Sequence, residues 1–268
     1  MEQLFTFVRE TTESYVLPHS TELQTAWIAL AIVSFTILIS NILVASYGRH
    51  YTKHSIIPSV DGKVGWMCME LVSPVTVWIY FQAFQAPGPR FSKGSFLLTL
   101  WMIHYSNRAV FSVVFSPSMK SSRLDTVLYS MFFNFINAGW VGYDLASVNL
   151  QPVPITLKFT LGFLLFVIGM AINISSDYHL KSLRRKTKGG EYVLPEWGLF
   201  KYILSPNYAG ETVEWIGYSL MLERESAWTF VLWTVCNLFP RARANLRWYK
   251  EKFGDKVGNR KSFIPGVI

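Results

Sequence analysis

Long apolar runs separated by short polar connections dominate the sequence. They cover residues 26–44, 66–84, 96–115, 127–142, 155–174, 212–222 and 228–239. A membrane-spanning helix needs about 20 mainly apolar residues. Charged residues make up only 16% of the chain, against roughly 25% in an ordinary soluble domain. We therefore predict an all-α integral membrane protein, a bundle of about seven transmembrane helices, and exclude a typical water-soluble enzyme.

The length of the chain sets its domain organisation. About seven crossings would take roughly half of the 268 residues, which leaves too little for a separate soluble domain. We expect a single polytopic membrane domain over residues 1–268. The two cysteines, Cys68 and Cys236, both lie in apolar runs, which excludes a disulfide framework and a CxxC metal site. No metal ion is therefore expected.

Basic residues gather on one side of the predicted bundle. Nineteen of the 25 Lys and Arg residues fall in connections on the side of the C-terminus, five fall on the opposite side, and Arg108 lies within a run. Because cytoplasmic connections carry the excess of Lys and Arg, we predict that the N-terminus is outside and the C-terminus is cytoplasmic. Such a surface attracts anionic headgroups. Without a soluble basic domain, no nucleic-acid partner is expected.

Polar residues inside the apolar runs indicate where chemistry takes place, because charges at bilayer depth are costly. Trp66, Glu70 and Ser73 share one helical face of run 66–84. One face of run 96–115 carries Trp101, Tyr105, Arg108 and Ser112. The two polar faces should meet. They would form either a ligand site or a buried Glu70–Arg108 ion pair that holds two helices together.

A second polar set enters the apolar segments of the C-terminal half. Its members, at roughly helical spacing, are Asn173, Asp177 and Arg184, followed by Asn207, Glu211, Glu214 and Tyr218. With the basic connection 181–201, they predict a polar cavity with a cationic rim that opens to the cytoplasm and suits a large anionic ligand. Neither GxGxxG after a strand nor GxxxxGK[ST] occurs, so a soluble nucleotide-binding fold is not the means.

Six motifs, in order along the chain, resemble those of the steroid 5α-reductase family. They are YGRH (47–50), GWMCMELVSP (65–74), HYSNR (104–108), INISSDYHLKSLR (172–184), SPNYAGETVEWIGYSL (205–220) and RARANLRWYKEKF (241–253). The resemblance implies a seven-helix membrane enzyme that uses NADPH to reduce the 4,5 double bond of 3-oxo-4-ene steroids. Residues 1–150 would mainly form the substrate pocket, and residues 151–268 would mainly bind NADPH.

The resemblance also implies roles for individual residues. Glu70 and Tyr105 would hold the ketone oxygen as the catalytic pair, and Trp66 and Met69 would contact the steroid. The cofactor-binding residues would be Tyr47, Arg49, Arg108, Asn173, Asp177, Arg184, Tyr192, Asn207, Glu211, Arg241 and Tyr249.

Four positions depart from the mammalian pattern of this family. Met69 stands in place of Gln, Ser175 in place of His, Val193 in place of Arg, and Asn245 in place of His. Met69 would neighbour the ketone, and Val193 removes a possible phosphate partner. These departures bear on substrate identity and on cofactor affinity.

The residue types suit the implied chemistry. Hydride addition to an enone builds negative charge on the carbonyl oxygen, and fixed donors in a dry site stabilise that charge. Tyr105 can donate from its hydroxyl, whereas Glu70 can donate only when protonated, a state that burial favours. We expect Glu70 to act as a neutral donor rather than as a structural partner of Arg108. Cations near Arg184 suit phosphates, because a guanidinium binds them bidentately.

The sequence leaves other functions open. These are reduction of another lipid enone, an enoyl-CoA or a polyprenol, a membrane methyltransferase, and a transporter that uses Glu70, Arg108 and Asp177 as a relay. We expect a monomer with membrane lipids as partners, into which an apolar substrate enters from the bilayer and NADPH from the cytosol. It would be multi-pass, in the endoplasmic reticulum if eukaryotic or the inner membrane if bacterial.

Overall fold

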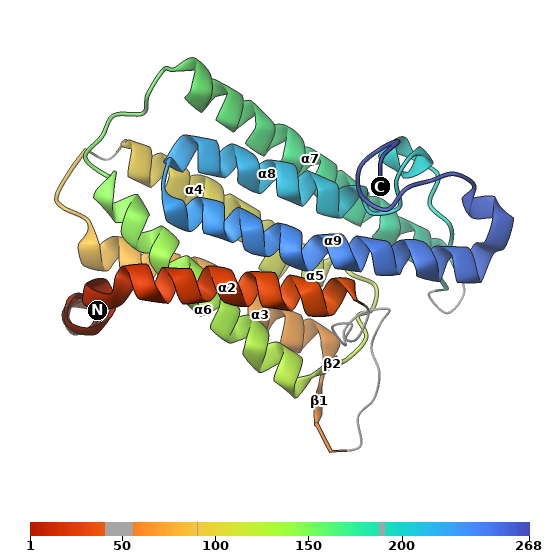
Figure 1. Ribbon diagram of the computed structural model, residues 1–268, viewed down its shortest axis with the longest axis horizontal. Coiled ribbons are helices and arrows are strands. Elements are labelled where there is room, and N and C mark those ends of the chain that lie inside the picture. The colour runs from red at the N-terminus through yellow and green to blue at the C-terminus, as the bar shows by residue number, and fades with distance from the viewer. Residues whose placement is uncertain (41–55, 90, 188–190) are drawn as a thin grey trace. The chain divides into compact units, whose positions relative to one another are not determined.

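The computed structural model describes residues 1–40, 56–89, 91–187 and 191–268 (Figure 1). Its helices are α1 (Glu2–Thr11), α2 (Ser20–Ile39), α3 (Gly62–Phe84), α4 (Lys93–Tyr105), α5 (Ser112–Val114), α6 (Leu124–Ser147), α7 (Leu157–Lys186), α8 (Pro206–Leu222) and α9 (Glu225–Phe253). Shorter helical turns are η1 (Thr12–Val16), η2 (Leu17–His19), η4 (Ser106–Phe111), η6 (Gly198–Lys201) and η7 (Gly254–Val257). Strands β1 (Ser59–Val60) and β2 (Ser122–Arg123) pair antiparallel, with Ser59 opposite Arg123. Tyr47 and Arg49 lie outside the described residues.

The all-α prediction is confirmed, and the described part of each apolar run falls largely within helical structure. Within the described residues, three helical segments are long and apolar enough to cross a membrane: Glu2–Ile39, Gly62–Phe84 and Leu157–Lys186. Seven crossings, and the orientation of the termini, stay predictions. The N-terminal helix α1 was not predicted, because residues 2–11 form no long apolar run, although Leu4, Phe5, Phe7 and Val8 recur at helical spacing.

The chain divides into two compact units. Unit 1 comprises Met1–Leu30, Ala45–Phe159 and Leu222–Ala227, and unit 2 comprises Ala31–Val44, Thr160–Met221 and Trp228–Ile268. The expectation of a single domain, and of a functional division near residue 150, stays a prediction. The candidate catalytic residues belong to unit 1. The candidate cofactor residues with described positions, apart from Arg108, belong to unit 2.

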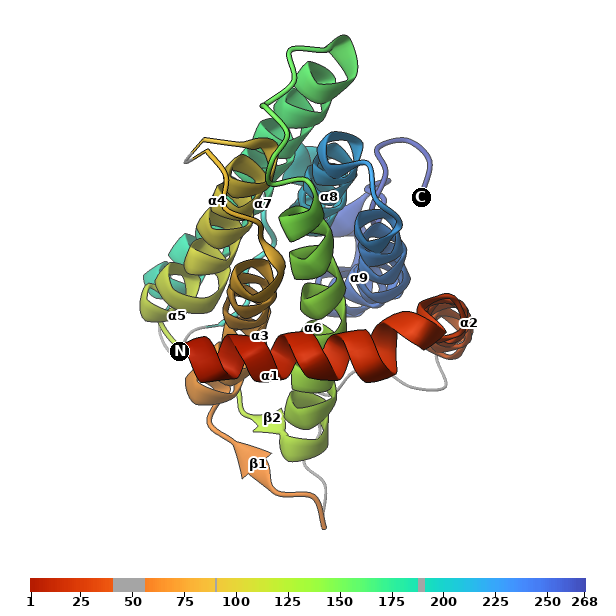
Figure 2. The same ribbon diagram turned by 90° about the vertical axis from the view of Figure 1, so that its left-hand side faces the viewer.

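In unit 1, α3 packs along α6, and α1 lies against α3 (Figure 2). Asp61 caps the start of α3, where its Oδ1 accepts from the backbone N–H groups of Lys63 and Val64. Phe5 of α1 meets the ring of Trp78 edge-on at 5.7 Å. These contacts fix both ends of α3, the helix that carries Glu70.

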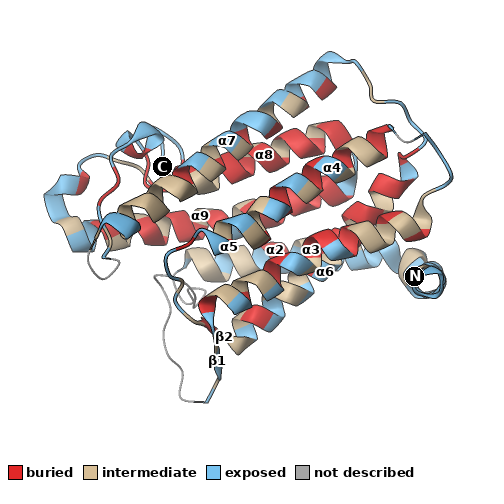
Figure 3. Cartoon of the chain, turned by 180° about the vertical axis from the view of Figure 1, so that it is seen from behind, coloured by how far each residue is buried: buried red, intermediate tan, exposed pale blue. Residues whose placement is uncertain are grey.

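In unit 2, α7, α8 and α9 form the main helical layer. No residue of α8 is exposed, as Figure 3 shows by its red and tan colour. The ring of Trp215 in α8 meets that of Phe230 in α9 edge-on at 4.8 Å. Apolar side chains of the C-terminal part of α9 pack with the segment before α8 in a cluster of Leu194, Leu204, Tyr249 and Val257.

The connection between α8 and α9 is held by a charged cluster in unit 1. Glu223 accepts from the ammonium groups of Lys93 at 3.3 Å and Lys158 at 2.6 Å. The Lys93 side chain is only 6% exposed. Glu223 adopts a φ of 60°, a left-handed conformation that is unfavourable for a residue other than glycine. The two ion pairs therefore hold a strained backbone in place.

We expect Glu223→Gln to lower the free energy of unfolding by about 1–3 kcal/mol, because Lys93 is then buried without a charged partner. Hydrogen bonds from Lys158 and Lys93 hold the pKa of Glu223 below its ordinary value of 4.5. The stabilisation is therefore complete above that value and is lost as the pH falls through the lowered pKa. Thermal unfolding at pH 7 and in the acid range measures both effects. Glu225→Gln is the matched control, and equal losses in the two variants would contradict the assignment.

Candidate active site

Glu70 lies in the first half of α3, where the continuous helix lacks one backbone hydrogen bond. Its side chain is buried, and Pro74 follows four residues later inside the same helix. Proline has no N–H, so residue 74 cannot donate the usual helical hydrogen bond to the carbonyl oxygen of Glu70. Both the side chain and the backbone of Glu70 thus present oxygen atoms within an apolar helix.

Arg108 lies in a π-helical turn that interrupts the neighbouring run. Helix α4 ends at Tyr105, and residues Ser106–Phe111 form η4. A π-turn closes i→i+5 hydrogen bonds and is frequent at functional sites. It also rotates the residues beyond it away from the face that a regular α-helix would give them. The π-turn changes the helical rotation between Tyr105 and Arg108, yet Trp101 before it and Arg108 within it both contact α3.

Glu70 and Arg108 form an ion pair. Nε of Arg108 donates to Oε1 of Glu70 at 2.9 Å, and the side chains are 21% and 10% exposed for Arg108 and Glu70. The guanidinium carbon lies 5.3 Å from the ring centroid of Trp66, and the indole N–H of Trp66 donates to the Arg108 carbonyl at 3.3 Å. The expectation that Glu70 is not a structural partner of Arg108 is therefore wrong. The alternative of a Glu70–Arg108 ion pair, which the two polar faces also predicted, is the one observed.

Tyr105 belongs to the same polar contact between the two helices. Its ring stacks on that of Trp101 at 5.3 Å, and both side chains are buried. The indole N–H of Trp101 donates to Oγ of Ser73 at 3.2 Å, and Ser73 is one helical turn from Glu70. The prediction that the two polar faces meet is confirmed. Met69 is held from the other side, since Nδ2 of Asn134 in α6 donates to its carbonyl at 2.8 Å.

A cavity of about 730 Å³ in unit 1 lies beside α3 and α6. Its walls include the aromatic residues Tyr80, Phe135, Trp140 and Tyr143. This volume lies within the range of ligand pockets. Glu70 and Tyr105 are not among its described lining residues. The cavity therefore offers apolar and aromatic surface on the same two helices that hold Glu70 and Asn134.

In unit 2, four of the predicted cofactor residues form one hydrogen-bonded chain between α7 and α8. Nδ2 of Asn173 donates to the Asn207 carbonyl at 3.0 Å and to Oε2 of Glu211 at 3.2 Å. Nδ2 of Asn207 donates to Oδ1 of Asp177 at 2.8 Å. The structure thus brings together residues that helical spacing placed in one polar set and to which the family resemblance assigned the cofactor.

Two pairs of glycines allow α7 and α8 to approach closely enough for these bonds. A Cβ atom at Gly169 would lie 2.3 Å from the backbone N of Glu214, and one at Gly217 would lie 2.4 Å from the carbonyl oxygen of Gly162. The two pairs are Gly169 with Gly210 and Gly162 with Gly217. Small residues that let helix backbones touch are typical of membrane helix pairs. These glycines were not predicted from the sequence, although Gly162 and Gly169 are seven residues apart in α7 and Gly210 and Gly217 are seven residues apart in α8.

Arg184 and Tyr192 meet at the end of α7. The guanidinium carbon of Arg184 lies 4.3 Å from the ring centroid of Tyr192. The ammonium group of Lys252 lies 5.5 Å from the same centroid, and the ring of Trp248 meets it edge-on at 4.8 Å. Cations and aromatic faces are therefore gathered beside each other, a combination that suits phosphates and a planar base.

The remaining predicted cofactor residues follow one face of α9. Arg241 and Tyr249, eight residues apart, are 7% and 1% exposed. Asn245 lies between them, and its Nδ2 donates to Oγ of Ser205 at 3.2 Å. Ser205 directly precedes α8 and was not singled out from the sequence. Tyr249 packs within the apolar cluster with Leu204, so its ring is held in place by packing.

The donor set of unit 2 fits a dinucleotide. Amide and carboxylate groups between α7 and α8 can bind hydroxyl and amide groups, and the cations near Tyr192 can bind phosphates. Among the described residues, no three His, Cys, Asp or Glu side chains are grouped so that they could hold a metal ion.

Residues 120–268, which hold the hydrogen-bonded chain of unit 2, match a known protein family. The sequence profile of the 3-oxo-5-alpha-steroid 4-dehydrogenase family matches residues 120–268, which is more than half of the chain. The chain belongs to the 3-oxo-5-alpha-steroid 4-dehydrogenase family. The matched part holds the candidate residues of unit 2, whereas Glu70 and Tyr105 precede it.

Individual members of the 3-oxo-5-alpha-steroid 4-dehydrogenase family match most of the chain. The chain is 33% identical to steroid 5-alpha-reductase DET2 of Solanum lycopersicum over 86% of its length and 90% of that protein. It is 34% identical to 3-oxo-5-alpha-steroid 4-dehydrogenase 1 of Mus musculus over 89% of its length and 93% of that protein. It is 34% identical to 3-oxo-5-alpha-steroid 4-dehydrogenase 2 of Rattus norvegicus over 84% of its length and 88% of that protein. Such proteins are oxidoreductases of steroid metabolism, and the resemblance read from the motifs is confirmed.

The role of the hydrogen-bonded chain between α7 and α8 can be tested by removing the Asp177 carboxylate, which accepts from Asn207. We expect Asp177→Ala to raise the apparent KM for NADPH by about 10-fold, because Asn207 loses the partner that orients it. Turnover at saturating NADPH should stay close to that of the unaltered protein. Ala171→Ser, at an exposed position of the same helix, is the control. An unchanged KM in Asp177→Ala would remove Asp177 from the cofactor site.

Proposed function

We propose that this protein reduces the 4,5 double bond of 3-oxo-4-ene steroids to 5α-reduced 3-ketosteroids, with NADPH as the hydride donor. The observation that carries the proposal is the ion pair of the buried Glu70 with Arg108, on helices where the buried Tyr105 stacks on Trp101 and Trp101 donates to Ser73, in a chain whose relatives are named for this reaction. Charged and hydroxyl groups at such a position are costly unless they serve a ligand or each other.

We propose that Tyr105 and Glu70 bind the ketone oxygen. As hydride reaches the β-carbon, negative charge develops on that oxygen, and the Tyr105 hydroxyl stabilises it by donating a hydrogen bond. Glu70 makes its ion pair as a carboxylate through Oε1, so it can donate to the ketone only after gaining a proton. We assign that proton to Oε2, while Oε1 continues to accept from Arg108. Trp66 and Met69 would contact the steroid beside this pair.

We propose that NADPH binds in unit 2. When bound, it supplies the hydride. The amides and carboxylates of Asn173, Asn207 and Glu211 would orient its polar groups, and Arg184 would bind phosphate beside the ring of Tyr192. Asp177 holds Asn207 in position, so its role is indirect. Arg108, Arg241 and Tyr249 complete the proposed set, and Tyr47 and Arg49 keep their assignment from the sequence.

The surroundings proposed for this enzyme follow from its apolar segments. The chain would cross the membrane about seven times as a monomer, with the C-terminus in the cytosol, in the endoplasmic reticulum of a eukaryote or the inner membrane of a bacterium. NADPH would then bind from the cytosol. The steroid would enter from the bilayer. The cavity walled by Tyr80, Phe135 and Trp140 offers aromatic surface on one side, while Asp144, Glu223, Arg224 and Glu225 line its charged end.

The cofactor assignment is tested by comparing nucleotides on the purified, reconstituted protein. We expect reduction of a 3-oxo-4-ene steroid with NADPH and much slower reduction with NADH. NADPH carries a 2′-phosphate that NADH lacks, and Arg184 with the cations near it would bind this group. Arg184→Ala should raise the apparent KM for NADPH by about 10-fold or more, as expected for one lost charge-assisted contact. Equal use of both nucleotides by the unaltered protein would contradict the assignment. Steroid, lipid-enone, enoyl-CoA and polyprenol substrates are compared in the same assay.

A further inference from the structure

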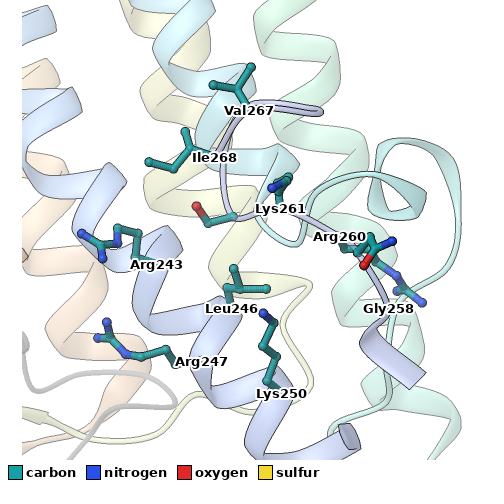
Figure 4. A pocket seen from close by; sticks show the side chains of 11 residues that line it. Arg243, Leu246, Arg247, Lys250, Gly258, Arg260, Lys261, Val267 and Ile268 are labelled. Atoms are coloured by element: carbon teal, nitrogen blue, oxygen red, sulfur yellow. The ribbon is translucent and has the colours of Figure 1, made fainter. Parts of the chain in front are cut away.

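A cationic cavity, separate from the aromatic cavity of unit 1, lies at the C-terminal end of unit 2. It encloses about 440 Å³ between α9 and the segment that follows η7 (Figure 4). Its cations are Arg243, Arg247, Lys250, Arg260 and Lys261. Among the described lining residues there is no Asp or Glu side chain. Five cations around one cavity create a strongly positive potential, which favours an anionic ligand.

This cavity is separate from the candidate cofactor site. Arg243, Arg247 and Lys250 recur at i, i+4 and i+7 and so occupy one face of α9. Arg241 and Tyr249 lie on the opposite face, where both are buried. A ligand bound among the first set therefore does not reach the second set, and the proposed reduction leaves these cations without a function.

The C-terminal wall of the cavity is held rigidly by backbone hydrogen bonds. Lys261 N donates to the Tyr202 carbonyl, and the Lys261 carbonyl accepts from Leu204 N, both at 2.9 Å. Nη1 of Arg260 donates to the Pro195 carbonyl at 2.8 Å. Arg260 thus contributes to the wall, and we assign the ligand contacts to Arg243 and Lys250 of α9 and to Lys261. A preformed wall reduces the ordering that binding would require.

Exposed apolar residues adjoin the cations. Val267 and Ile268 line the cavity and are 70% and 39% exposed. Ile264, which donates its backbone N–H to the Ile268 carbonyl, is 47% exposed. Tyr202, whose carbonyl accepts from Lys261 N, is 59% exposed. A small soluble phosphate would contact the cations only. An amphiphile with a phosphate headgroup would use the cations and the apolar residues together.

We propose that this cavity is a specific binding site for the phosphate headgroup of an anionic phospholipid, with the lipid chains against Val267 and Ile264. A guanidinium binds phosphate oxygens bidentately and an ammonium binds them as a point charge. Basic pockets at the membrane surface recognise anionic headgroups by this combination. The site would fix the C-terminal half of α9 against the bilayer surface, independently of steroid reduction.

Native mass spectrometry of the full chain, purified in detergent and titrated with phosphatidate or phosphatidylcholine, tests this site. We expect phosphatidate to bind more tightly than phosphatidylcholine. The double variant Arg243→Gln/Lys250→Gln should weaken phosphatidate binding by about 10-fold or more, since charge-assisted contacts are lost. Lys63→Gln/Lys120→Gln removes the same charge from the predicted cytoplasmic side elsewhere in the chain and should change binding by less than about 2-fold.

Each other outcome overturns the proposal. Equal weakening in both double variants would show attraction by net charge alone. Displacement of phosphatidate by the same concentration of inorganic phosphate or adenosine 2′,5′-bisphosphate would identify a site for soluble phosphates. If the Gln variant does not fold, as judged by its thermal unfolding, Arg243→Lys keeps the charge and loses the bidentate contact. Unchanged phosphatidate affinity in that variant would also contradict the proposal.

Discussion

Replacing Glu70 with Ala is expected to lower turnover of a 3-oxo-4-ene steroid by at least about 100-fold, the usual effect of removing one donor from a developing oxyanion. The same change leaves the Arg108 guanidinium without its partner. Breaking a buried pair costs about 3–5 kcal/mol, and the 21% exposure of Arg108 places the cost near the lower end. Glu70→Gln keeps an oxygen that accepts from Arg108 and an amide that donates, so both losses should be smaller.

A comparison with Arg108→Gln separates catalysis from packing. This variant breaks the same ion pair but leaves the Glu70 carboxyl group in place. Any effect of Arg108 on cofactor affinity disappears at saturating NADPH, so single-turnover rates are measured there, beside thermal unfolding of each variant. If Glu70 binds the ketone, Glu70→Ala is slower than Arg108→Gln at equal loss of stability. Equal rates in the two variants, or undiminished turnover in a folded Glu70→Ala protein, would end the catalytic assignment.

The second large effect is expected at the glycine contact between α7 and α8. Gly169→Leu should lower the free energy of unfolding by about 3 kcal/mol or more, because its Cβ would meet a backbone atom of Glu214 at 2.3 Å. The helices must then separate, which breaks the bonds of Asn173 to Asn207 and Glu211. We therefore expect NADPH to be lost on purification, as measured by nucleotide release after denaturation.

A graded series sharpens this test. Gly169→Ala introduces only the Cβ atom and should destabilise the protein less than Leu. Ala171→Leu enlarges an exposed position two residues away on the same helix and should leave both stability and NADPH retention nearly unchanged. A Gly169→Leu protein that melts with the unaltered protein would mean that α7 and α8 do not pack through this glycine.

The sequence predicts the helices well because their cause is local. An apolar run long enough to cross a bilayer has few alternatives to a helix, so runs 66–84 and 127–142 fall within α3 and α6. The polar chain of unit 2 was predictable for the same reason, since Asn173 and Asp177 share a helical face whatever packs against it. Helix α1 escaped prediction because it is too short and polar to form an apolar run, although its apolar residues recur at helical spacing.

The partner of Glu70 depends on geometry beyond spacing. A regular helix through residues 96–115 would carry Tyr105 and Arg108 on one face, and either could then meet Glu70. The π-turn at Ser106–Phe111 changes the rotation of the helix between them, and its i→i+5 bonds leave no signature in the residue types. The residue types allowed both a ligand site and an ion pair, and the expectation of a neutral donor without Arg108 as its partner was the wrong choice between them.

The short connection at Glu223 also has a consequence for how the chain enters a membrane. Helix α8 carries the buried carboxyl groups of Glu211 and Glu214, each of which costs roughly 2.5–3.5 kcal/mol on insertion near the centre of a bilayer. Alone, α8 would be a poor substrate for the insertion machinery. Because it ends at Leu222 and α9 begins at Glu225, we expect the two helices of the predicted seven-span topology to enter together as a hairpin. In the predicted seven-span topology, α7 is inserted first and then offers Asn173 to Glu211, so we expect the residues proposed to bind the cofactor also to lower the cost of inserting α8 and α9.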